Sequence, residues 1–216
     1  MHPKEILEII SGGESSTVEF KRKISTEVKI AKEIAAFANT IGGWLFLGVD
    51  DDGTVVGVES EKADVNEIKK ICEFYIVPPI EPKIEIIHIF KLDIIAIFIE
   101  KSNLRPHKIK SDPDDKNSKS VTYIRVGAKC VIASSEFTKV LAGQNINSKP
   151  ITISIGDREK RLFNYLENYE RATVKDFACL VNISKRRAER ILVQLVRAGV
   201  LQIHVDSEED YFTYIN

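Results

Sequence analysis

The sequence predicts a two-domain α+β protein, in which a mixed sheet with flanking helices is followed by a smaller helical domain that ends in two short strands. Three observations lead to this prediction. Strand-like and helix-like patterns alternate along residues 1–145. Residues 150–216 follow another order, with three helical segments before two β-rich runs. A polar stretch at 143–150 (GQNINSKP) separates the two patterns, so we place the domain boundary there.

Length and composition exclude several classes of protein. The 216 residues suffice for one large domain or two modest ones. Apolar residues make up 44% and charged residues 29%, which is typical of a globular chain with a core and excludes general disorder. The formal net charge of −1 excludes a uniformly basic nucleic-acid coat, so a nucleic-acid surface has to be a local patch.

Cysteine usage and hydropathy bear on the cellular location. Cys72, Cys130 and Cys179 lie far apart and form no CxxC motif, so neither a disulfide framework nor a structural zinc site is expected. A reducing, cytoplasmic location is therefore the expectation. The longest apolar runs have the length of strands, and we expect no membrane span.

Apolar spacing assigns the elements of the first domain. Helices are expected where apolar residues recur every three or four positions, and strands where they alternate or form short runs. In chain order, the predicted elements are a helix at 3–11, a strand at 17–23, a helix at 27–38, strands at 44–49 and 54–58, a helix at 62–77, strands at 83–90, 92–100, 121–125 and 129–132, and a helix from 135 to about 142.

The first two strands differ in their expected burial. Val18 and Phe20 alternate with Glu19 and Lys21, which indicates a half-buried strand whose charged residues point away from the core. The run Trp44–Val49 is apolar throughout, so we expect this strand to lie in the middle of its sheet.

Turn and cap residues separate these elements. Ser25 or Thr26 can cap the helix at 27–38, and the glycines at 42–43 allow the positive φ that its exit needs. Asp50–Gly53 predicts a hairpin turn into the strand at 54–58. Pro78-Pro79 is expected to end the helix at 62–77.

The second domain has the element order of a known module. Its predicted elements are helices at 157–170, 173–181 and 184–198, followed by β runs at 200–205 and 211–215. A tight turn at Asn182-Ile183 separates the second and third helices. Helix, helix, turn, helix and two-stranded wing is the order of a winged helix-turn-helix.

The third helix of this domain predicts a nucleic-acid contact. In such modules the N-terminal part of this helix enters the major groove, where arginine can bridge phosphates or read guanine edges. The basic residues in its first two turns are Lys185, Arg186, Arg187 and Arg190. The acidic wing tip at 207–210 would repel a phosphate backbone. A solvated helix face, or a winged helix that contacts a protein, are therefore the alternatives.

Four segments of the first domain carry a combined motif. They are ESSTVEFK at 14–21, IAAFANTIGG at 34–43, LFLGVDDDG at 45–53 and RVG at 125–127. In this order they resemble the Schlafen AlbA_2 family, formerly described as a divergent AAA domain, over about residues 1–145. The resemblance implies a domain that often precedes a winged helix in bacterial and archaeal DNA-binding regulators. Vertebrate Schlafen proteins carry related domains that act as metal-dependent RNA endonucleases.

The resemblance to those nucleases places candidate catalytic and metal-binding carboxylates on Glu14, Glu19 and Asp50. Oxygen ligands from separate segments suit Mg²⁺ or Mn²⁺, which would activate water for cleavage. Lys21 lies two residues after Glu19 and can contact a phosphate. The alternative is that Glu19 and Lys21 form a surface ion pair and that Asp50 belongs to an ordinary hairpin turn.

ATP binding is not expected. The sequence has no G-x-x-x-x-G-K-[ST] motif, because Gly42-Gly43 is followed by Trp44. The glycine pair is better explained as the end of a helix that leads into a buried strand.

We therefore expect a nucleic-acid-binding protein, and specifically a DNA-binding transcriptional regulator that needs no cofactor for binding and can act as a homodimer. DNA is expected over RNA as the partner, and a membrane is not. Besides the third helix of the second domain, Lys21 and Arg22 are candidate nucleic-acid contacts. A Mg²⁺- or Mn²⁺-dependent endoribonuclease and a winged-helix protein-interaction adaptor are the alternatives.

Overall fold

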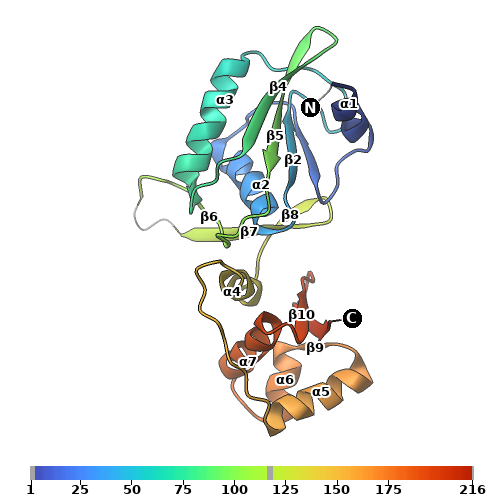
Figure 1. Ribbon diagram of the computed structural model, residues 1–216, viewed down its shortest axis with the longest axis vertical. Helices are drawn as coiled ribbons and strands as arrows, with labels where there is room; N and C mark the ends of the chain where they lie inside the picture. Colours follow the sequence, from blue (N-terminus) through green and yellow to red (C-terminus); the bar gives the residue numbers. More distant parts are fainter. Residues whose placement is uncertain (1–2, 116–118, 216) are drawn as a thin grey trace. The chain divides into compact units, whose positions relative to one another are not determined.

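The computed structural model describes residues 3–115 and 119–215 (Figure 1). Its contacts divide the chain into two compact units, the first reaching Ile132 and the second beginning at Ala133. This division precedes the stretch at 143–150, because α4 (Ser135–Gly143) packs against α7 (Lys185–Arg197) within the second unit. Of the polar loop around 111–120, residues 116–118 lie outside the described part of the chain.

The first unit contains two four-stranded sheets. In the first sheet β1 (Val18–Lys21) and β2 (Gly43–Leu47) are parallel, and the other neighbours are antiparallel. Its strands, in spatial order, are β1 (Val18–Lys21), β2 (Gly43–Leu47), β5 (Leu92–Ile99) and β4 (Lys83–Ile89). The second sheet is antiparallel, with the order β3 (Ile76–Val77), β6 (Lys108–Lys110), β7 (Ser120–Val126) and β8 (Lys129–Ile132). As expected from its apolar sequence, β2 lies inside its sheet.

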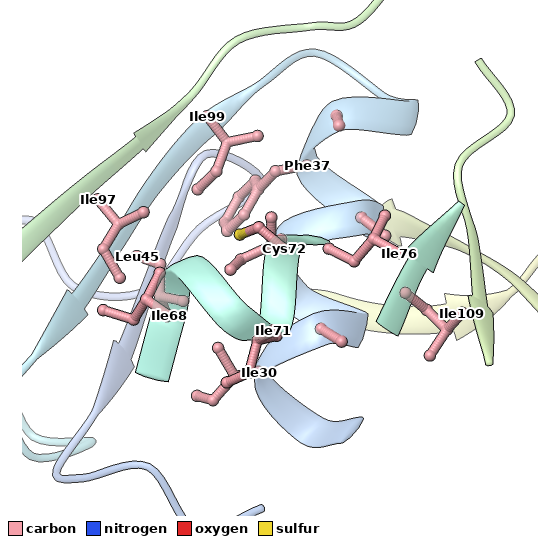
Figure 2. Packing of buried hydrophobic residues seen from close by; sticks show 14 of the residues in the cluster. Ile30, Phe37, Leu45, Ile68, Ile71, Cys72, Ile76, Ile97, Ile99 and Ile109 are labelled. Carbon is pink, nitrogen blue, oxygen red and sulfur yellow. The ribbon is translucent and has the colours of Figure 1, made fainter. Parts of the chain in front are cut away.

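Helix α2 (Glu27–Asn39) joins the two sheets. It packs against β2 and β5 of the first sheet and against β6, β7 and β8 of the second. Thr26 begins the helix, because its hydroxyl accepts a hydrogen bond from the Lys29 N–H at 3.3 Å. Figure 2 shows Ile30 and Phe37 of α2 within the resulting core. On the other face of the first sheet, α1 (Pro3–Ser11) buries Ile6 and Ile10 in a second apolar cluster.

Two predicted elements of the first unit were wrong in detail. The segment at 62–77 is not one helix. It consists of α3 (Glu61–Lys70), a π-helical turn at Ile71–Tyr75 and β3, which pairs with β6. The wider turn places Ile71, Cys72 and Ile76 together in the core.

The predicted strand at 54–58 forms only the isolated bridge between Val49 and Val55. The N–H groups of Val56 and Gly57 both donate to the carbonyl oxygen of Gly48 at 2.9 Å, so this segment crosses the strand end instead of extending a ladder. Gly48 has φ +87°, and a Cβ there would come within 2.9 Å of the Gly57 backbone.

The second unit is winged-helix-like, with its elements in the predicted order. After α4 come α5 (Asp157–Tyr169), β9 (Ala172–Thr173), α6 (Val174–Val181), α7, β10 (Leu201–His204) and β11 (Tyr211–Tyr214). Strand β9 adds a third, unpredicted strand to the wing, giving the order β10-β11-β9. Leu162, Phe177, Leu192 and Phe212 lie in one buried core. Across residues 3–115 and 119–215, no helix is long and apolar enough to cross a membrane.

Candidate nucleic-acid interface

The N-terminal half of α7 presents its basic side chains to solvent. Ala188, Leu192 and Leu195 face the core of the unit, which leaves the opposite face of the helix outside. The exposed basic residues of this half are Lys185, Arg186, Arg187 and Arg190. The first turn of α7 has no acidic residue, and Ser184 caps it. Cations are therefore concentrated where the helix N-terminus itself attracts anions.

Helix α4 turns this face of α7 into one side of an open groove of about 550 Å³. Five of its nine lining residues are basic, and one is acidic. The lining residues are Lys139, Ser184, Arg186, Arg187, Glu189, Arg190, Val193, Gln194 and Arg197. The groove is thus positive, although the whole chain has a net charge of −1.

The single acidic residue of the groove is neutralised by α4. Oε1 of Glu189 accepts a hydrogen bond from the Ser135 hydroxyl at 3.1 Å and forms an ion pair with Nζ of Lys139. The Glu189 side chain is only 13% exposed. Its charge is therefore paired inside the unit and does not oppose an incoming phosphate.

Arg197 closes the far end of the groove. Its Nη2 donates to the carbonyl oxygen of Lys149 at 3.1 Å, and its stem lies against Gly143. A Cβ at Gly143 would come within 2.1 Å of the Arg197 Nε, so a glycine permits this close approach. The buried Nε has no hydrogen-bond partner among the described residues.

Two of these basic residues were not predicted from the sequence. Arg197 follows Arg186 and Arg190 on the outer face of α7, and this helical spacing is a signal that could have identified it. Lys139 precedes α7 by more than forty positions, and no sequence pattern connects the two helices. In the acidic wing tip predicted at 207–210, residues 207–209 are exposed and Asp210 is half-buried, which favours the groove over the wing as the phosphate-binding surface.

The three carboxylates that the resemblance selects each have a separate partner. Oε1 of Glu14 accepts the Phe20 N–H at 3.0 Å. Glu19 pairs with two cations, and Oδ2 of Asp50 lies 2.8 Å from Nη1 of Arg22. Within the described ranges, no three His, Cys, Asp or Glu side chains are placed so that they could hold a metal ion. Glu14, Glu19 and Asp50 therefore do not form a shared metal site in this arrangement.

Glu19 belongs instead to a buried charge cluster. Nη1 of Arg125 lies 2.7 Å from Oε2 of Glu19 and 2.9 Å from Oε2 of Glu33. Nη2 of Arg125 donates to the Ser15 carbonyl oxygen at 2.6 Å. The Arg125 side chain, 1% exposed, also lies over the Phe37 ring, 4.6 Å from its centroid. This arginine thus ties β7, α2 and the segment before β1 together.

The pKa shifts in this cluster follow from burial and from opposite charges. Burial raises the pKa of Glu33, the Glu19 carboxylate raises it further, and the nearby cations only partly offset both. Burial works to lower the pKa of Lys21, but its hydrogen bond and attraction to Glu19 outweigh it, so that pKa is raised. Lys21 is therefore held as a cation.

The expectation of a half-buried first strand was wrong. Val18, Glu19 and Phe20 are all buried, and the Glu19 carboxylate is enclosed with Arg125 of β7 and Glu33 of α2. The ion pair of Glu19 and Lys21 is present, but it is largely buried. Of the two basic candidates in this unit, Lys21 is 26% and Arg22 64% exposed, and both are paired with carboxylates.

The protein thus consists of an α+β unit with two sheets, followed by a winged-helix-like unit that carries a basic groove. The chain belongs to the Schlafen AlbA_2 family, whose model matches residues 14–134, more than half of its length. Residues 158–214 match the PCI domain.

Two solved structures match parts or most of this chain. The DIP2311 protein of Corynebacterium diphtheriae matches 98% of this chain with 19% identity and a TM-score of 0.51. This chain spans only 37% of that protein. The N-terminal domain of a RecG-related protein of Nitrosomonas europaea matches 62% of this chain, and 91% of its own length, with 21% identity and a TM-score of 0.43.

Proposed function

We propose that the protein binds nucleic acid through the groove between α4 and α7 and acts as a DNA-binding transcriptional regulator. The observation that carries this proposal is the gathering of five basic side chains in one groove with a single acidic residue. That residue, Glu189, pairs with Lys139, so four positive charges remain uncompensated by the lining of the groove. Membership of the Schlafen AlbA_2 family supports it, because such domains commonly precede a winged helix in regulators.

The groove and the helix end would have different roles in binding. Lys139, Arg190 and Arg197 would contact phosphates and fix the position of the protein on the strand. Arg186 and Arg187, near the N-terminal end of α7, would bridge phosphates and reach base edges in the major groove. A homodimer would place two such helices on half-sites about one helical turn apart.

A salt titration of the affinity tests this proposal. We would measure binding to a labelled DNA duplex by fluorescence anisotropy, for the wild type and for a variant with Arg186→Ala and Arg187→Ala. Each lost phosphate contact should reduce the slope of log affinity against log salt by about one. A matched control removes two exposed arginines of α5 that lie outside the groove, Arg158→Ala and Arg161→Ala. Equal affinities and slopes for both double variants would contradict the proposal.

The same material tests the alternatives. Metal-dependent cleavage of structured RNA with Mn²⁺ that disappears in Glu19→Gln, with the fold of the variant confirmed by thermal melting, would favour the endoribonuclease. Absence of binding to any nucleic acid would favour the protein-interaction adaptor.

A further inference from the structure

The turn between β4 and β5 combines two unfavourable features. The two strands are paired without interruption from Lys83 opposite Phe98 to Ile89 opposite Leu92, so only Phe90 and Lys91 form the turn. Their φ values are +50° and +70°. A two-residue turn with two positive φ values normally uses Asn and Gly, because a side chain with a Cβ is strained in this conformation.

Phe90 is also the most exposed large apolar side chain among the described residues, at 82%. It belongs to none of the apolar clusters of the first unit. Figure 1 shows the hairpin, in green, projecting from one end of that unit. A bulky ring that is 82% exposed and whose residue has its backbone in the left-handed region adds little to the stability of the fold, and such an outlier points to a function.

We infer that Phe90 stacks on a nucleobase and that Lys91 contacts the adjoining phosphate. This inference rests on the proposed function, because it assumes that the protein binds nucleic acid. An exposed aromatic ring beside a cation is the combination that proteins use to bind unpaired strands without sequence preference. A lipid surface would need a wider apolar face, but the polar side chains of His88 and Asp93 are hydrogen-bonded to each other immediately behind the turn.

Three substitutions separate the role of the ring from its cost to the fold. Phe90→Asn removes the ring and places a favourable residue in the turn. Phe90→Leu keeps the strain and the apolar bulk but has no π face. Phe90→Trp keeps and enlarges the π face. We would measure thermal unfolding of each variant and its affinity for a single-stranded oligothymidylate and for a DNA duplex.

The expected result is a change of opposite sign in stability and in binding. Phe90→Asn should raise the unfolding temperature by roughly 2–4 °C. It should also weaken single-strand binding about five- to 150-fold, the range that corresponds to the loss of one base-stacking aromatic side chain. Phe90→Leu should weaken binding similarly, and Phe90→Trp should retain it. If Phe90→Asn weakens binding to the duplex and not to the single strand, the ring inserts between neighbouring base pairs of the duplex and unstacks them.

Three results would overturn the inference. Wild-type affinity of Phe90→Asn for both ligands would show that the ring does not contact the nucleic acid. Full binding by Phe90→Leu would replace stacking with a simple apolar contact. Wild-type protein that binds neither ligand would refute the proposed function itself, an outcome distinct from the other two.

Discussion

Replacing Arg125 by methionine is expected to destabilise the first unit strongly. The substitution keeps the apolar volume but leaves Glu19 and Glu33, whose side chains are 8% and 14% exposed, with Lys21 as the neighbouring cation. Breaking a buried ion pair by removing one partner costs about 3–5 kcal/mol. For a chain of this length, that loss corresponds to a fall in unfolding temperature of about 6–20 °C.

Urea unfolding followed by circular dichroism would measure this loss. The matched control is Arg22→Met, which removes an exposed ion pair with Asp50 and should cost no more than about 1 kcal/mol. A second variant, Glu33→Gln in the Arg125→Met background, should recover part of the stability because it removes one of the two carboxylates that lose Arg125. Equal effects of Arg125→Met and Arg22→Met would refute the view that the buried cluster holds the unit together.

Three further predictions concern pH, the groove and a helix cap. The pKa of Glu33 is raised in the folded state, so its protonation stabilises the fold below the unfolded value of 4.5, and this contribution is lost as the pH rises through the folded pKa. Urea titrations from pH 4 to pH 7 should therefore show Glu33→Gln gaining stability relative to the wild type as the pH rises. Lys139→Ala should weaken DNA binding, although it lies outside α7, because it leaves the Glu189 carboxylate without its ion-pair partner beside the groove; an unchanged affinity would remove α4 from the interface. Thr173→Ala should cost about 1 kcal/mol, because the Thr173 hydroxyl and Asp176 cap α6 reciprocally at 2.9–3.1 Å; calorimetry with no shift would contradict this.

Local patterns in the sequence were sufficient to predict most helices and strands of the fold. The apolar spacing of α2, the hairpin of β4 and β5 and the element order of the second unit all depend on near neighbours along the chain. The π-helical turn after α3 was not predictable in this way, because it exists where three apolar residues have to enter one core that other segments build.

The candidate sites were less predictable than the fold elements, because they depend more on contacts between residues that are distant in the sequence. The cations of α7 are contiguous in the sequence and were identified directly. The alternation of apolar and charged residues correctly placed Glu19 on the face opposite Val18 and Phe20. Burial of Glu19 requires Arg125 from the other sheet, and no local sequence pattern predicts such a partner. For the same reason, the sequence did not indicate that α4 borders the groove.

The position of Arg125 in the chain has a consequence for folding during synthesis. The residue is seven positions before the end of the first unit, and its partners Glu19 and Glu33 are near the beginning. The cluster cannot form until nearly the entire unit has left the ribosome. Until then, the face of α2 that carries Glu33 remains uncovered. Such distant pairing makes folding slow. A nascent first unit therefore remains exposed to chaperones and to aggregation for most of its synthesis.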